Sequence, residues 1–447
     1  MEIPIIENII KKIDIPFSIS KDKDKLFIFG RNPTLSLAEL ISMFKSTTNR
    51  FEIIEISPSG VILRPENEWV PSVEQGGMIL KRCSPVSSIK KPASNSEIND
   101  LCVKFVDSLF IDNKCHWSIS SYNERNQDDA QIYDNFYKAI RENLKKNGIK
   151  KAMYVKPEYT FDKVTSYKQN TKKHHKTNLK ILMPRALHRK HILDNGFELV
   201  LYHTKDEIIV CQTDQAINID DLKKRDVKRP FVRPMLGIGV ALARSMVNLA
   251  MQPRGSTIYD PFCGTGTIVQ EAHLSGYNAM GSDIDSQCVQ GAFENLQWIT
   301  KTYEKQEFPT ENIFSLDLTN AMDKYKKGYF AAIVTEPYLG PPLKFYPNVS
   351  DAQKMKNDLT KRFNVYFRNI SYLLHKNGMC VIIVPRIRSN EGEYFSLDVE
   401  KLFSKHGFEV YNEHFNDALL PYVFIHAPKD QKIEREIYVL KKRKKIS

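Results

Sequence analysis

Residues 257–283 read TIYDPFCGTGTIVQEAHLSGYNAMGSD, and the fold class follows from this stretch. A short apolar strand ends at Asp260, a glycine turn follows, and residues 268–274 form the start of a helix that Gly276 closes. A second strand then ends at Gly281-Ser282-Asp283. Glycines at a strand-to-helix turn allow the backbone to approach a ligand closely. The stretch therefore predicts the first β-α-β unit of a ligand-binding α/β domain.

The acids that end these two strands indicate a nucleoside ligand. Asp283 lies 23 positions after Asp260, a distance of about one helix plus one strand. A carboxylate after the second strand can accept hydrogen bonds from both hydroxyls of a ribose. We therefore expect Asp260, Phe262, Gly264, Gly266 and Asp283 to bind a cofactor. The alternative is a structural turn in another kind of α/β protein.

Two common nucleotide sites are excluded by spacing. The run G-x-x-x-x-G-K-[ST], which supplies a lysine and a hydroxyl for triphosphate and magnesium, is absent. The G-x-G-x-x-G spacing of dinucleotide sites is also absent at this turn.

Strands and helices alternate throughout the last part of the chain. Strands are predicted at residues 257–259, 279–282, 331–334 and 380–384. This alternation is typical of a parallel, doubly wound, Rossmann-like sheet. Asp317 follows a further strand-like stretch and could accept a hydrogen bond from an adenine amino group, although a helix N-cap explains it equally well.

The fourth predicted strand leads into residues 335–342, which read TEPYLGPP. S-adenosylmethionine-dependent amino methyltransferases carry an Asp/Asn/Ser-Pro-Pro-aromatic loop at this place. An exocyclic amine conjugated with its ring is a poor nucleophile, so acceptors on its N–H groups are needed to free its lone pair. An aromatic ring stacks on the extruded base.

Four residues of this loop are the predicted catalytic set: Thr335, Glu336, Pro337 and Tyr338. Thr335 stands at the usual acidic or amide position, and Glu336 replaces the first proline. We expect Tyr338 to stack on the base and Thr335, with the backbone carbonyl of Glu336, to orient the amine. Glu336 could supply a charge if the loop turned slightly. The alternative is a proline-rich structural turn.

The first half of the chain reads as two α+β modules followed by a linker. Residues 26–63 show a strand, a helix and a hairpin, so an N-terminal domain is predicted over 1–100. A second domain is predicted over 101–215, with a helix at 131–146 and a hairpin formed by 197–202 and 208–211. Residues 216–234 are charged and read as a linker to a domain over 235–447.

Positive charge is concentrated in the second of these modules. The formal net charge is +12, and residues 145–190 hold fourteen Lys or Arg against two acids. Such a block attracts polyanions by releasing their counterions, whereas the alternative is a solvated loop with no partner. The block supplies the candidate RNA-binding residues, which are Lys172, Lys173, Lys176, Arg185, Arg189 and Lys190.

Other residue patterns limit the class of protein. The seven cysteines lack any CxxC pair, so we expect reduced thiols and no metal site. The adjacent pair His174-His175 would point to opposite faces of a strand, which disfavours shared metal ligation. No run of about 18 apolar residues occurs, and residues 1–16 do not read as a secretion signal. We therefore expect a cytoplasmic location.

These residues together resemble the THUMP-containing tRNA guanosine N2-methyltransferases, which methylate position ten of tRNA. The resemblance extends over residues 25–40, 101–215, 228–250, 260–267, 281–296 and 435–440. It implies a ferredoxin-like N-terminal domain, a THUMP domain that grips the tRNA acceptor end, and a methyltransferase domain that uses S-adenosylmethionine. It also leaves room for a small activating protein subunit as a partner besides tRNA.

Two other functions stay open at this point. An N6-adenine methyltransferase on nucleic acid would use the same cofactor fold and a similar loop. A non-catalytic RNA-binding partner with a degenerate acceptor loop would account for the sequence Thr335-Glu336.

Overall fold

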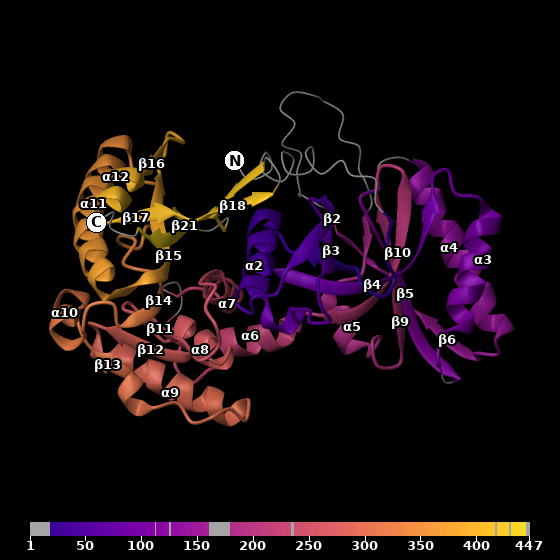
Figure 1. The fold of residues 1–447 in the computed structure, drawn as a ribbon, viewed down its shortest axis with the longest axis horizontal. Coiled ribbons are helices and arrows are strands. Elements are labelled where there is room, and N and C mark those ends of the chain that lie inside the picture. The colour runs from indigo at the N-terminus through magenta and orange to yellow at the C-terminus, as the bar shows by residue number, and fades with distance from the viewer. Residues whose placement is uncertain are drawn as a thin grey trace.

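A computed structural model describes residues 18–111, 113–124, 127–160, 179–233, 237–415, 418–428 and 431–443. The chain forms two halves that lie side by side, each built around one large sheet (Figure 1). We call residues 18–216 the N-terminal half and residues 237–443 the C-terminal half. Among the described helices, none is long and apolar enough to cross a membrane.

The N-terminal half holds a single eight-stranded sheet with the strand order β2-β3-β1-β4-β10-β9-β5-β6. Its strands are β1 (Lys25–Phe29), β2 (Phe51–Ser57), β3 (Gly60–Pro65), β4 (Ile79–Lys90), β5 (Lys114–Tyr122), β6 (Lys151–Tyr154), β9 (Gly196–His203) and β10 (Glu207–Ala216), with β7 (Glu158–Thr160) and β8 (Leu179–Ile181) paired apart from it. Its helices are α2 (Pro33–Lys45), η1 (Val73–Gln75), α3 (Asn95–Asp107), α4 (Gln127–Lys146) and α5 (Pro184–Arg189).

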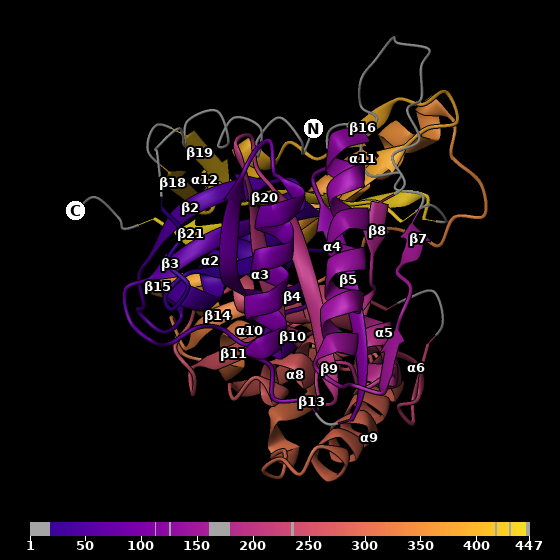
Figure 2. The ribbon, with the colours of Figure 1, turned by 90° about the vertical axis from the view of Figure 1, so that its right-hand side faces the viewer.

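The long strand β4 joins the two modules that the sequence predicts as separate domains. Its first residues pair with β1, and residues 81–90 pair with β10. The strand has twelve residues, which is long enough to take part in both modules. Buried and partly exposed positions alternate along most of it. The strands on the two sides of the predicted domain boundary near residue 100 therefore belong to one continuous sheet. Helices α3 and α4 lie beside each other on one face of it (Figure 2).

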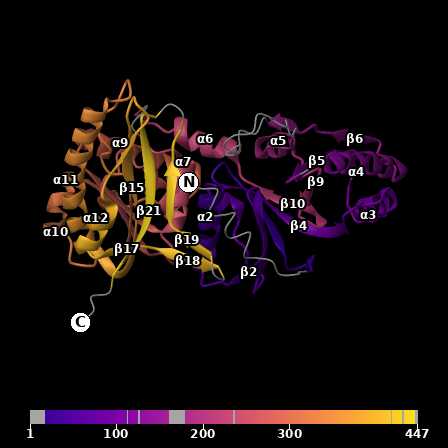
Figure 3. The ribbon, with the colours of Figure 1, turned by 90° about the horizontal axis from the view of Figure 1, so that it is seen from above.

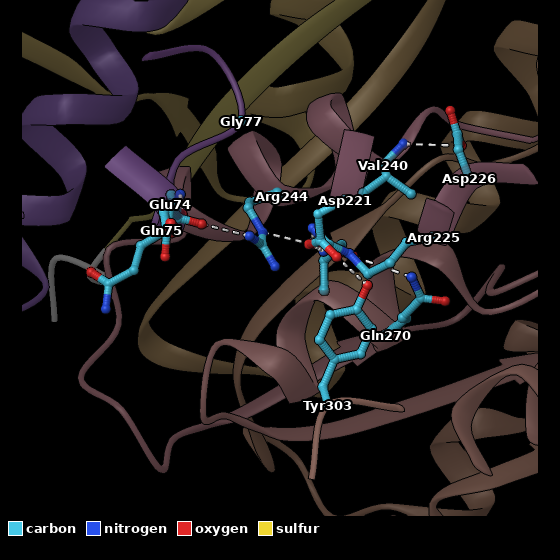
Figure 4. A network of polar contacts seen from close by, with 12 residues as sticks. Glu74, Gln75, Gly77, Asp221, Arg225, Asp226, Val240, Arg244, Gln270 and Tyr303 are labelled. Atoms are coloured by element: carbon cyan, nitrogen blue, oxygen red, sulfur yellow. Dashed lines mark hydrogen bonds and ion pairs between the residues drawn. The ribbon is translucent and has the colours of Figure 1, made fainter. Parts of the chain in front are cut away.

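The segment predicted as a linker contains a helix, α6 (Ile219–Val227). Its charged side chains, which are also typical of a linker, hold the helix in place. Arg225 is buried and its Nε donates to Glu271 over 2.9 Å, while Arg244 Nε lies 2.6 Å from the same carboxylate. Tyr303 donates to Asp221 over 2.6 Å (Figure 4). Breaking paired buried charges of this kind is costly, so these contacts hold α6 firmly against the C-terminal half.

The C-terminal half is a doubly wound α/β domain with the strand order β13-β12-β11-β14-β15-β21-β17. Its strands are β11 (Thr257–Asp260), β12 (Asn278–Asp283), β13 (Ile313–Ser315), β14 (Phe330–Thr335), β15 (Leu374–Arg388), β16 (Tyr394–Ser396), β17 (Phe408–Val410), β20 (Val423–His426) and β21 (Ile433–Lys442), with β18 (Asn412–Phe415) and β19 (Ala418–Pro421) forming a separate hairpin. Strands β11 to β15 run parallel and β21 antiparallel to β15, so the predicted parallel sheet is confirmed.

Helices cover both faces of this sheet. They are α7 (Val240–Leu249), α8 (Thr267–Leu274), α9 (Ser286–Thr302), η2 (Thr310–Asn312), η3 (Leu318–Asn320), α10 (Ala321–Lys324), α11 (Val349–Leu373) and α12 (Val399–Lys405). Apolar residues of α7, α8 and α9 share one core with the sheet, and those of α10, α11 and α12 share another. The order of the strands reverses between β11 and β14, where the carboxyl ends of parallel strands bind ligands.

The two halves meet where α2 packs against α7, as seen from above in Figure 3. One apolar core includes residues of both helices. Glu39 of α2 is buried and its carboxylate accepts from the backbone N–H groups of Gly77 and Met78, both over 2.8 Å, and from Asn248 Nδ2 over 2.9 Å. Burial raises the pKa of Glu39 despite these donors. The shared core fixes the N-terminal half relative to the site described next.

Candidate active site

A large cavity opens at the carboxyl ends of β11, β12 and β14. Its volume is about 1140 Å³, slightly above the range of about 300–1,000 Å³ that pockets for one small molecule occupy. There is therefore room for a cofactor and part of a second ligand. The predicted residues that line it are Asp260, Phe262, Gly264, Asp283, Asp317, Glu336, Pro337 and Tyr338.

The glycine loop between β11 and α8 contains backbone conformations with positive φ, which glycine adopts more easily than other residues. Gly264 and Gly266 have φ values of +51° and +83°. A Cβ atom on Gly266 would lie 3.0 Å from the Cβ of Ala292, so α9 approaches the loop closely there. Gly266 begins α8 behind the cavity, whereas Gly264 lines it and has open space around its Cα.

Asp283 anchors the glycine loop and still faces the cavity. Its Oδ2 accepts from the backbone N–H of Gly264 over 2.9 Å, and its Oδ1 accepts from the N–H of Asp285 over 3.0 Å. A carboxylate has about four lone-pair sites, so each oxygen can accept one more hydrogen bond. The side chain can thus bind two hydroxyl groups of a ligand without releasing the loop.

Ile284 is a cavity residue that the sequence patterns did not single out. It is 72% exposed and lines the cavity directly after Asp283. An apolar side chain left so exposed at the edge of a cavity can pack on a flat ring such as adenine. Its position after the acid that ends the second strand was the available signal.

Asp260 is buried at the end of β11, and its Oδ1 accepts from the N–H of Phe262 over 3.1 Å. The hydroxyl of Thr335 donates to the same oxygen over 2.6 Å. Burial raises the pKa of Asp260 to about 7, although these two donors oppose the shift, and the charges of Asp283 and Glu336 add to it. Asp260 is therefore a carboxyl whose charge changes close to neutral pH.

Thr335 is placed differently from our expectation. Its side chain is fully buried, it does not line the cavity, and its hydroxyl donates its proton to Asp260. The structure therefore does not present this hydroxyl to a target amine. The reason is that Thr335 is still the last residue of β14, which pairs with β11, so its hydroxyl lies within reach of the Asp260 carboxylate at the end of β11.

Glu336 is the carboxylate that this loop presents to the cavity. Its Oε1 accepts from Arg435 Nε over 2.5 Å, and both side chains are largely buried. Within the described part of the chain, Oε2 of Glu336 has no hydrogen-bond partner. Arg435 also lines the cavity and was missed as a site residue, because it lies on β21, 99 positions away. The pair offers one oriented carboxylate oxygen to an N–H donor.

The rest of the acceptor loop forms one wall of the cavity. Tyr338 is 46% exposed, and the guanidinium carbon of Arg362 lies 5.5 Å from the centre of its ring. Gly340, with a φ of +120°, turns the chain back, and a Cβ there would lie 3.2 Å from Ile433. The Tyr338 ring is thus held at the rim with area available for stacking.

Phe262 and Asp317 both line the cavity. The ring of Phe262 meets that of Tyr366 edge-on, with centroids 4.7 Å apart. Asp317 caps η3 by accepting from the N–H of Thr319 over 2.8 Å, and it also lines the cavity. The two interpretations of Asp317 from the sequence, as a cap and as a ligand contact, are therefore compatible.

The predicted RNA-binding residues that the structure describes, Arg185, Arg189 and Lys190, do not line this cavity. Lys172, Lys173 and Lys176, like His174 and His175, lie outside the described residues. Arg185 and Arg189 lie on α5 in the N-terminal half, and both pair with Asp220 over 2.8 Å. Lys190 follows them and is exposed. The cations of α5 that the structure describes are thus partly neutralised by one acid.

Comparison with known proteins agrees with this geometry. A family model described as the RMKL-like methyltransferase domain UPF0020 matches residues 229–385. A protein of Methanothermococcus thermolithotrophicus named "Probable tRNA (guanine(10)-N2)-dimethyltransferase" is 28% identical over 195 residues, which are 42% of this chain and 99% of the relative. Residues 229–385 are therefore a methyltransferase domain, and the predicted resemblance to this group of enzymes is confirmed.

Other relatives match over shorter stretches. The tRNA (guanine(10)-N2)-dimethyltransferase of Methanothermobacter thermautotrophicus is 51% identical over 73 residues, or 16% of this chain and 21% of the relative. That of Pyrococcus abyssi is 36% identical over 120 residues, or 27% and 33%. The chain thus spans at most a third of the length of these two relatives. TrmN from Thermus thermophilus has a TM-score of 0.50 and 13% identity, with 94% of this chain and 99% of that structure covered, which supports the overall fold.

Proposed function

We propose that this relative of the tRNA (guanine(10)-N2)-dimethyltransferases transfers a methyl group from S-adenosylmethionine to the exocyclic N2 amine of a guanosine in tRNA. The observation that carries the proposal is the position of Glu336. Glu336 lines the same cavity as the glycine loop and Asp283, and its Oε2 has no hydrogen-bond partner among the described residues. A methyl donor and an amine acceptor would therefore meet in one enclosed space.

The residues around the glycine loop suit the cofactor. Asp283 would accept from the ribose hydroxyls, Ile284 would pack on the adenine, and Asp317 would accept from its amino group. Asp260, which has a pKa of about 7 and is ionised above that pH, would face the positively charged end of S-adenosylmethionine. When bound, S-adenosylmethionine supplies an activated methyl group on its sulfonium.

The residues of the acceptor loop suit a guanine. Its N1–H and N2–H groups are adjacent donors, and a carboxylate can accept from such an edge. Glu336 would accept from the amine through Oε2 while Arg435 holds Oε1, and the backbone carbonyl of Glu336 is a further candidate acceptor. Tyr338 would stack on the base. Thr335 would act indirectly, through its hydrogen bond to Asp260.

The N-terminal half would bind the tRNA. We keep the assignment of a ferredoxin-like and a THUMP domain, joined by the shared sheet, and of Lys172, Lys173, Lys176, Arg185, Arg189 and Lys190 as RNA contacts. The cytoplasmic location and a small activating subunit belong to the same proposal. Replacing Lys172, Lys173 and Lys176 by glutamine should weaken tRNA binding and flatten its dependence on salt, because each phosphate contact contributes to the slope.

The proposal is tested by transfer of tritium from methyl-labelled S-adenosylmethionine to unmodified tRNA transcripts. The wild-type chain should label tRNA but not double-stranded DNA, and Glu336→Gln should label tRNA much more slowly with cofactor binding intact. Labelling of DNA would favour an adenine methyltransferase instead. Cofactor binding by calorimetry without transfer to any nucleic acid, even with candidate partner subunits present, would indicate a non-catalytic role.

A further inference from the structure

Aromatic rings and basic side chains alternate along the surface that leads away from the cavity. Lys432 lines the cavity, and its Nζ lies 4.8 Å from the centre of the Tyr346 ring. The guanidinium carbon of Arg388 lies 5.5 Å from the Tyr346 ring centre and 5.8 Å from that of Tyr394. Arg386 lies 3.8 Å from the Tyr394 ring. We call Lys432, Tyr346, Arg388 and Tyr394 the aromatic–basic track.

Four separate segments supply this track, and backbone hydrogen bonds tie them together. Tyr346 lies between the acceptor loop and α11, Arg388 ends β15, Tyr394 begins β16, and Lys432 precedes β21. The N–H of Asn390 donates to the carbonyl of Pro347 over 2.8 Å, which joins the Tyr346 segment to the turn after Arg388. The track is therefore a built surface rather than one loose loop.

The track is accessible, and its basic groups are available. Tyr394 is 44% exposed and Arg388 is exposed, whereas Tyr346 and Lys432 are half-buried, and Phe345 beside Tyr346 is 82% exposed. Among the described residues, Arg388 and Lys432 have no carboxylate within ion-pair distance.

Acids bound the track on one side. Arg386 lies 3.6 Å from Glu434 and 4.0 Å from Glu436, and the Tyr394 hydroxyl donates to Glu434 over 3.3 Å. Glu391 and Glu393 are exposed on the turn beyond. A polyanion would therefore contact the cavity side of the track, where the unpaired cations lie.

We propose that the aromatic–basic track binds the single-stranded nucleotides next to the target base. This inference rests on the proposed function. A base extruded into the cavity leaves its neighbours outside at the rim, where Lys432 stands. Rings stack on bases of any sequence, and Arg and Lys next to them contact phosphates. The alternation of unpaired cations with rings fits a nucleotide chain better than an apolar protein segment.

The test measures binding of the full chain to a fluorescent single-stranded oligouridine by anisotropy, together with methylation of tRNA. Tyr346→Leu should bind the oligonucleotide about fivefold more weakly or worse, since stacking is worth about 1–3 kcal/mol per base. The double variant Arg388→Gln/Lys432→Gln should also bind it more weakly, because two cations that contact phosphates are lost. Removing each cation that binds a phosphate should reduce the salt slope by about 0.7. Tyr346→Phe keeps the ring and should bind as the wild type does.

The control is Lys361→Gln/Arg368→Gln, which removes two exposed charges from α11 and should change oligonucleotide affinity little. Calorimetry with S-adenosylmethionine shows whether each variant is folded, and the two Tyr346 variants and the control should give wild-type affinity. A 4-thiouridine oligonucleotide on the wild-type chain should cross-link to peptides that contain Tyr346 or Tyr394, which requires no variant.

The outcomes separate this inference from the proposed function. If the track variants bind the oligonucleotide more weakly but the wild-type chain methylates no tRNA, the track is supported and the proposed function is rejected. Active tRNA methylation with unchanged oligonucleotide affinity, unchanged KM for tRNA and cross-links only elsewhere would overturn the track. The surface would then be free for a protein partner.

Discussion

The hydroxyl of Thr335 donates a hydrogen bond to the buried carboxylate of Asp260 over 2.6 Å, and so joins the start of the acceptor loop to the start of the cofactor loop. The bond is one of the donors that oppose the effect of burial on the pKa of Asp260. The two loops that would hold the two substrates are therefore coupled through one titratable group.

This coupling predicts a pH-dependent difference in stability. The pKa of Asp260 rises from 3.8 to about 7 on folding, so its buried charge destabilises the fold above pH 7, and this cost fades as the pH falls toward 4. Asp260→Asn should therefore melt several degrees higher than the wild type at pH 8, with a smaller difference at pH 5. Thr335→Val should melt lower than the wild type at pH 8. Differential scanning fluorimetry at pH 5 and pH 8 measures these melting temperatures. If Asp260→Asn differs from the wild type by the same amount at both pH values, the raised pKa of Asp260 is contradicted.

Cofactor affinity should depend on Asp283. Hydrogen bonds to a charged group are worth about 1.5–3 kcal/mol each, so Asp283→Ala should weaken S-adenosylmethionine binding at least about tenfold. Loss of its bond to the Gly264 N–H would add to the effect. Glu294→Ala, which removes an exposed acid from α9, is the matched control. Calorimetry on folded protein measures both, and equal affinity in the two variants would remove Asp283 from the site.

Turnover should depend on Glu336 more than on Thr335. Groups that act on the reacting centre typically contribute about a hundredfold or more, so Glu336→Gln should lower kcat by about that factor. Thr335→Ala should have a smaller effect, because its hydroxyl is engaged with Asp260. Arg435→Lys should fall between them, since it keeps the charge beside Glu336 but not the guanidinium geometry. Single-turnover rates rank the variants, and a larger loss in Thr335→Ala would return the acceptor role to Thr335.

Tyr338 should matter for RNA but not for the cofactor. Stacking of a base on an aromatic ring is worth about 1–3 kcal/mol, so Tyr338→Ala should lower kcat/KM for tRNA by about fivefold or more. Tyr338→Phe keeps the ring and should retain most activity. S-adenosylmethionine affinity should stay unchanged in both variants. If Tyr338→Ala methylates tRNA at the wild-type rate, the loop has only a structural role.

The features that the sequence reveals are those that depend on neighbours in the chain. The strand, glycine turn and helix at residues 257–274 follow from local spacing, and so does the position of Asp283 after the second strand. Local spacing alone therefore predicts that the glycine turn and Asp283 lie at one ligand site, and both line the cavity.

The features that the sequence does not reveal depend on partners far along the chain. The Thr335 hydroxyl bonds to Asp260, 75 positions earlier, because β14 packs beside β11, and no local pattern indicates that contact. Arg435 and Glu336 are 99 positions apart and meet only because β21 joins the sheet next to β15. The long strand β4, which unites two predicted domains, likewise depends on its pairing with β10.

Mass spectrometry of the nucleosides of a tRNA transcript, after incubation with this chain and S-adenosylmethionine, tests the proposed methylation of guanosine. The geometry of Glu336, Tyr338 and Asp283 predicts N2-methylguanosine, N2,N2-dimethylguanosine or both, and their loss with Glu336→Gln. N6-methyladenosine in place of a methylated guanosine, or a methylated guanosine that persists at the same rate in Glu336→Gln, would contradict it.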